Sequence, residues 1–81
     1  MIKRIETSDG RKLTLLKTTK RITLYVEPGW CAPKWVERTR WIDENEHNWA
    51  IYDGMFHRIR YMGKTYNDWM QIRGEVGREI A

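Results

Sequence analysis

Residues 48–69 read NWAIYDGMFHRIRYMGKTYNDW, and this stretch decides how the rest of the chain is interpreted. Two runs rich in aromatic and β-branched residues flank the pair Asp53-Gly54, which tolerates the positive φ angles of a type I′ turn. The second run alternates between two faces as a β-strand does, with Phe56, Arg58 and Arg60 on the same face. The stretch therefore predicts a β-hairpin.

A helix is expected after this hairpin. Thr65, with Asp68 three residues later, is a variant of the capping box that starts helices. The apolar residues that follow recur at the spacing of one helical face: Trp69, Ile72, Val76 and Ile80. We expect this face to pack on the sheet, although Gly74 and Gly77 weaken a helix by roughly 1 kcal/mol each.

The first half of the chain predicts an antiparallel meander. Residues 2–7, 12–17 and 21–27 read as strands, separated by an Asp-Gly turn and by a loop at 18–20. Residues 35–43 fit a strand, although a short helix starting at Pro33 also fits. The predicted fold class is α+β: a single domain over residues 1–81, with a small antiparallel sheet or partly open barrel of five or six strands and a C-terminal helix.

Composition narrows the class of protein. The chain of 81 residues carries five Trp, four Tyr and one Phe, enough aromatic surface to hold a small core. Its single cysteine, Cys31, excludes an internal disulfide and favours a reducing, cytoplasmic location. No signal peptide and no apolar run of about 20 residues is found, so a membrane partner is not expected.

Charge is unevenly distributed. Residues 1–27 contain seven Lys or Arg against three Asp or Glu, and this excess of four equals the net charge of the whole chain, +4. A basic segment of this kind suits phosphate groups or an acidic protein surface. A solvated, charge-mixed surface is the plainer interpretation.

Catalytic and metal-binding motifs are weak. His57 and Asp53 could together act as a general base, but no nucleophile motif accompanies them. Cys31, His47 and His57 do not follow any zinc spacing. We therefore expect a protein that is not an enzyme and that uses no cofactor and no metal.

Basic residues interleaved with aromatic residues on strands are the most informative pattern. Small β-rich nucleic-acid-binding proteins stack bases on aromatic rings while Lys and Arg contact the phosphates. The first hypothesis is accordingly a non-catalytic nucleic-acid-binding or regulatory domain. Its predicted binding residues are Lys17, Lys20, Arg21, Tyr25, Arg58 and Arg60.

The alternative is a compact protein-binding module, such as the small accessory inhibitors of phages and mobile elements. Such a module often self-associates through an aromatic patch, so a homo-oligomer is part of this hypothesis. The residues expected to bind the protein partner are Trp35, Trp41 and Phe56.

One segment carries a family resemblance. In HRIRYMGKTYNDW, a strand ends in the aromatic Tyr61, a turn follows at Gly63, and Asp68-Trp69 form an acidic–Trp pair. This order resembles the signature of chromo-barrel and tudor-type modules, over about a sixth of the chain. The resemblance conflicts with the predicted helix. No binding residues are carried over from it.

Overall fold

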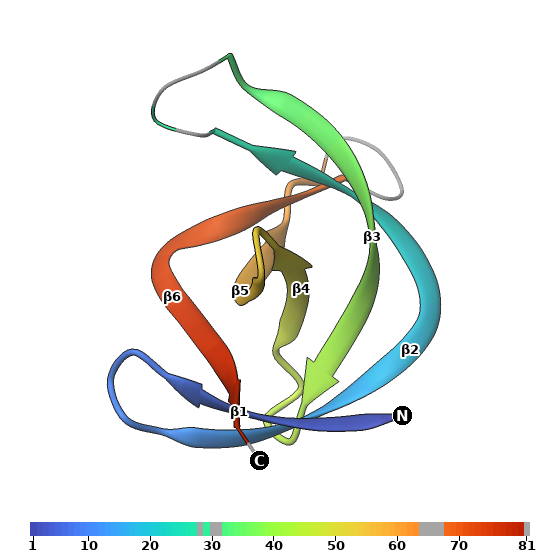
Figure 1. Cartoon of the computed structure of the whole chain (residues 1–81). Helices are drawn as coiled ribbons and strands as arrows, with labels where there is room; N and C mark the ends of the chain where they lie inside the picture. Colours follow the sequence, from blue (N-terminus) through green and yellow to red (C-terminus); the bar gives the residue numbers. More distant parts are fainter. Residues whose placement is uncertain (28, 30–31, 64–67, 81) are drawn as a thin grey trace.

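The computed structural model describes residues 1–27, 29, 32–63 and 68–80, and in it six β-strands form a closed barrel (Figure 1). The strands are β1 (Ile2–Thr7), β2 (Lys12–Val26), β3 (Lys34–Asp43), β4 (Asn48–Tyr52), β5 (Met55–Tyr61) and β6 (Asp68–Ile80). Each strand pairs antiparallel with the next, as in an up-and-down meander.

Strand β6 closes the barrel. Its C-terminal half pairs antiparallel with β1, where Arg4 lies opposite Ile80. Its N-terminal half pairs parallel with β2, over Thr23–Tyr25 and Asp68–Met70. Both ends of the chain therefore lie on neighbouring strands, as Figure 1 shows.

The expected loop at residues 18–20 is wrong, because β2 continues through it. The register with β3 shifts between Lys17 and Arg21, which marks a bulge. Before the bulge Leu13 and Leu15 are buried, and after it Ile22 and Leu24 are buried. The bulge thus changes which residues point inward and bends β2, so that one strand serves both halves of the barrel.

The core divides into two clusters along β2. The first contains Ile5, Leu13, Leu15, Trp41, Trp49 and Phe56, and the second contains Ile22, Leu24, Val26, Ala50 and Ile59. Trp41 and Phe56 are each only 3% exposed and meet edge to face, with ring centroids 5.3 Å apart. These two rings were expected at a partner surface. They fill the core instead, because a small barrel needs large apolar side chains inside.

Asp43 organises the turn between β3 and β4. Its carboxylate accepts hydrogen bonds from the backbone N–H groups of Asn45 and His47, at 2.8 and 2.9 Å. It also accepts one from the indole Nε1 of buried Trp49, at 2.9 Å. One buried acidic side chain thereby fixes both the turn and a large core ring.

The C-terminal helix is a wrong prediction, and with it the α+β class. Residues 68–80 form strand β6, and the described part of the chain is all-β, without a helix. Gly74 adopts φ +81° at the bend of β6, a conformation that is costly for other residues. A Cβ on Gly77 would lie 2.7 Å from Cδ1 of Ile5, so any larger residue at this point of the β6–β1 pairing would force the buried side chain of Ile5 to shift. The apolar spacing of 3 to 4 residues was coincidental. Thr65 lies outside the described residues.

Several predictions are confirmed. The expected strands at 2–7 and 35–43 are β1 and β3, the latter in place of the alternative short helix. The turn between β4 and β5 has positive φ at Asp53 (54°) and Gly54 (80°), as the Asp-Gly pair predicts. The antiparallel sheet is also as predicted. In the described ranges, no helix is long and apolar enough to cross a membrane. Cys31 falls outside them.

Candidate nucleic-acid interface

Four residues form a row across the outer face of the barrel. Trp35 of β3 lies opposite Tyr25 of β2, and Tyr25 lies beside Met70 of β6. Met70 in turn lies opposite Arg60 of β5. Because strands are about 4.8 Å apart, the row spans about 14 Å. We call these four residues the outer row.

The two rings of the outer row differ in exposure: Trp35 is exposed and Tyr25 is half-buried. Their centroids lie 5.0 Å apart with planes at 59°, and Trp35 is 49% exposed. The alternation of β2 after its bulge explains this placement, because Ile22, Leu24 and Val26 fill the core and Tyr25 points outward. These rings are therefore not required to fill the barrel.

Arg60, at the other end of the outer row, is exposed and forms no ion pair with any described residue. Arg58, predicted as its companion, is held differently. Its Nη1 lies 3.1 Å from a carboxylate oxygen of Glu75, and its side chain is only 25% exposed. Arg58 is thereby held in an ion pair with Glu75, whose carboxylate also lies 3.7 Å from Nη2 of Arg11.

The bulge of β2 gathers the other predicted cations. Lys17, Lys20 and Arg21 are all exposed there. Arg21 donates from Nη1 to Oγ1 of Thr39 on β3, at 3.2 Å. Arg21 and Tyr25 lie four residues apart on outward positions of the same strand. The structure thus brings Tyr25 and Arg60 into one row and leaves the three cations farther along the same wall.

A cleft of about 550 Å³ opens beside the outer row. It forms where β6 bends away from β2, and we call it the row cleft. Tyr25, Met70 and Arg60 line one part of it, and Arg73 and Ile72 line another. Arg73, like Arg60, is exposed and makes no ion pair within the described ranges.

A second cleft, of about 470 Å³, lies beside the β4–β5 turn, and we call it the hairpin cleft. Its lining includes Val26, Lys34, Tyr52 and Met55. The Nζ of Lys34 lies 6.0 Å from the ring centroid of Tyr52 and the guanidinium of Arg38 lies 5.6 Å from it. These distances are within the range of cation–π attraction.

Three side chains line both clefts: Glu27, His57 and Gln71. The Nε2 of His57 lies 3.1 Å from the carbonyl oxygen of Tyr52. Because a carbonyl oxygen only accepts, Nε2 carries the proton and Nδ1 is left as an acceptor. Burial lowers the pKa of His57, against the opposing effects of the Tyr52 carbonyl and Asp53, so the ring is neutral at pH 7.

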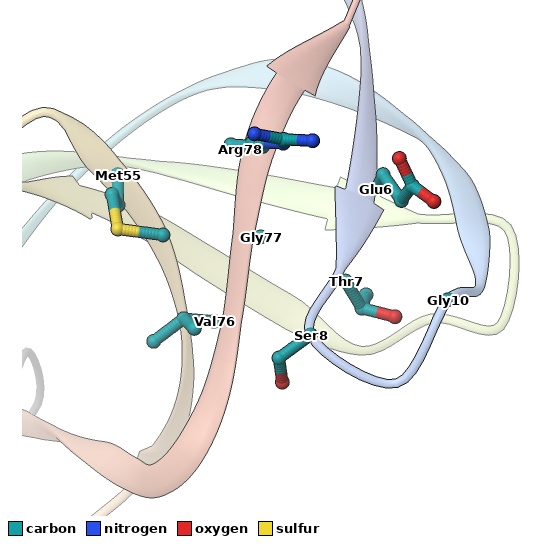
Figure 2. A pocket seen from close by; sticks show the side chains of 8 residues that line it. All are labelled: Glu6, Thr7, Ser8, Gly10, Met55, Val76, Gly77 and Arg78. Carbon is teal, nitrogen blue, oxygen red and sulfur yellow. The ribbon is translucent and has the colours of Figure 1, made fainter.

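A third, smaller pocket of about 290 Å³ straddles the β1–β6 seam. Figure 2 shows Met55 and Val76 on one side of β6 and Glu6 and Thr7 on the other. Arg78 lies opposite Glu6 in the register, so the cation here faces an acidic neighbour. No cluster of three metal-binding side chains occurs among the residues that the structure describes.

Sequence reasoning missed Met70, Arg73, Glu27, Lys34 and Gln71. Three of the five lie on or next to strand pairings that the predicted helix hid, because a helix cannot place Met70 beside Tyr25. The alternation of 21–27 did carry a usable signal for Glu27, which continues the outward set after Tyr25.

Comparisons of this chain with protein-family models, with curated proteins and with solved structures find no significant match. The function of this chain is therefore inferred from the site itself.

Proposed function

We propose that this protein is a non-catalytic nucleic-acid-binding domain of regulatory type that holds a single strand on its outer row. One observation carries the proposal: the exposed ring of Trp35, the half-buried ring of Tyr25 and an arginine without an ionic partner in the described residues are aligned across four strands. Bases stack on aromatic rings whatever their sequence, and arginines beside the rings contact the phosphates.

The size of the outer row fits a short segment. Its span of about 14 Å accommodates two bases on Tyr25 and Trp35 and a backbone that reaches Arg60. Arg73 in the row cleft and the cations of the β2 bulge extend the positive surface on either side. A rigid duplex offers no free base to these rings, so single strands are the expected ligands.

The test is the binding of fluorescent oligothymidylate and oligouridylate, each about 12 nucleotides long, measured by anisotropy at low and moderate salt. We expect affinity to fall with salt, with a slope of about −0.7 for each phosphate contacted. Tyr25→Ala and Trp35→Ala should each weaken binding by roughly fivefold or more. An absence of binding to both strands at low salt would overturn the proposal.

A matched pair of arginine variants separates the outer row from general charge. Arg60→Gln and Arg4→Gln remove the same charge, but Arg4 is an exposed residue of β1 on the seam with β6. We expect the first to weaken binding and to reduce the salt slope by about one contact. The second should have a much smaller effect. Equal effects would mean that only net charge attracts the strand.

A second apolar row favours the protein-binding alternative. Ile2, Leu16 and Ile42 lie side by side across β1, β2 and β3. Ile2 is 62% exposed and Leu16 is 50% exposed. Contact with a second copy of the chain would cover this patch, but three residues fall far short of the roughly 800 Å² per partner of a stable interface. Sedimentation at rising concentration tests it: Leu16→Lys should abolish any self-association, and a monomer at all concentrations would exclude it.

A further inference from the structure

The row cleft and the hairpin cleft share three of the residues that line them. Glu27, His57 and Gln71 line both clefts, which places one carboxylate, one imidazole and one carboxamide between them. Cations lie on both sides of this trio: Arg60 and Arg73 in the row cleft, and Lys34 in the hairpin cleft. A strand that crosses the trio would thus meet positive charge before and after it.

The hydrogen-bonding capacity of the trio is specific. Glu27 is exposed and forms no ion pair with any residue that the structure describes, so its two oxygens remain acceptors. His57 offers Nδ1 as a further acceptor, because its Nε2–H donates to the carbonyl of Tyr52. Gln71 supplies both a donor and an acceptor. The trio therefore favours a ligand edge that is rich in donors and carries one acceptor.

We propose that Glu27, with Gln71 and His57, forms a base-reading position that prefers guanine in the strand bound on the outer row. This inference rests on the proposed function and adds a sequence preference to it. Tyr25 lies two residues before Glu27, which follows the last residue of β2, and both line the row cleft. Two residues of extended chain span about 7 Å, so a base next to the one stacked on Tyr25 comes within reach of Glu27.

Guanine is the base whose edge matches the trio. Its N1–H and N2–H groups are adjacent donors for the two oxygens of a carboxylate, and its O6 accepts from the amide of Gln71. Adenine and cytosine each present a ring-nitrogen lone pair beside their single amino donor, and this lone pair repels a carboxylate. Thymine and uracil offer one donor flanked by two carbonyl oxygens. A carboxylate left facing these groups is unpaired, which is the source of discrimination.

The experiment uses the full chain and oligothymidylates of about 12 nucleotides with one central guanine, adenine or cytosine, again read by anisotropy. We expect the guanine probe to bind at least about fivefold more tightly than the other two. Glu27→Gln should remove this preference, and because it removes a negative charge beside the strand it should raise the affinity for plain oligothymidylate. Glu46→Gln, the same charge change on an exposed turn residue outside both clefts, should retain the preference.

The outcomes separate the two proposals. Salt-dependent binding of all probes with equal affinity would overturn the guanine preference and leave the proposed function intact. Loss of the preference in Glu46→Gln as well would also overturn it, because a distant charge would then be responsible. Failure of every probe to bind would overturn both.

Discussion

The two halves of β2 build two different parts of the molecule from one strand. Residues 12–17 belong to what we call the closed half, where the first core cluster meets the Asp43 turn and the polar groups of that turn are paired. Residues 21–26 belong to the cleft half, where the outer row and both clefts lie. One bulged strand thus supports a hydrogen-bonded turn and a buried indole in the closed half, and the outer row and both clefts in the cleft half.

The largest expected effect is a loss of stability caused by a substitution in the closed half. Asp43→Ala removes three hydrogen bonds and leaves the Nε1 of buried Trp49 without an acceptor. We expect the free energy of unfolding to fall by about 3 kcal/mol, measured by urea denaturation. Asp43→Asn, which keeps one acceptor oxygen, should fall between this variant and the natural chain. A loss below about 0.5 kcal/mol would show that the turn does not depend on this carboxylate.

The second effect tests the seam between β6 and β1. Gly77→Ala places a Cβ 2.7 Å from Cδ1 of Ile5, which is fully buried. Overpacking at such a site costs about 1–3 kcal/mol, so the midpoint of denaturation should fall. Gly29→Ala is the matched control, because a Cβ there meets nothing within 4 Å. Equal stability of the two variants would contradict the close crossing of β6 and β1.

The third prediction compares the closed half with the cleft half by measuring both stability and oligonucleotide affinity for one variant in each. Trp35→Ala removes the ring contact with Tyr25 on the outer row and should cost only about 1 kcal/mol of stability. Its effect on oligonucleotide affinity should be the larger one, as proposed above. For Asp43→Ala we expect the reverse: a large loss of stability, with unchanged affinity of the folded fraction. Thermal denaturation and anisotropy on the same two proteins decide this.

The smallest expected effect concerns pH. Because burial lowers the pKa of His57 in the folded chain, the unfolded chain binds the proton more readily. The contribution of His57 to stability is therefore complete above its unfolded pKa, about 6.5, and declines as the pH falls below that value. Urea denaturation at pH 7.5 and 5.5 measures it. His57→Asn should show a weaker decline over this window than the natural chain.

The β4–β5 hairpin could be predicted from the sequence, but the C-terminal strand β6 could not, and the reasons can be identified. Asp53-Gly54 acts locally, so its turn followed directly from the two residues. Trp69, Ile72 and Val76 have a spacing that suits a helix, but the parallel pairing of β6 with β2 joins residues far apart in the chain. No local pattern encodes such a pairing, and tertiary contacts override local spacing here.

In the candidate site, too, some features follow from the local sequence and others depend on the pairing of distant strands. Tyr25 was predicted from the alternation along β2, and its place in one row with Arg60 depends on β6 lying between them. Arg58 has the same residue type and the same strand as Arg60, but it forms an ion pair with Glu75. Only the register of β5 with β6 distinguishes the two arginines. Residue type was therefore predictable from the sequence, and ionic pairing was not.

The closure of the barrel by β6 has a consequence for how the chain reaches its folded state. β6 pairs with β1, β2 and β5, so the backbone groups on the second edge of β1 remain unpaired until β6 is in place. Pairings between such distant segments slow folding, because the loop between them must be closed first. During that interval the apolar side chains of the meander have no complete enclosure, and association between nascent chains competes with folding.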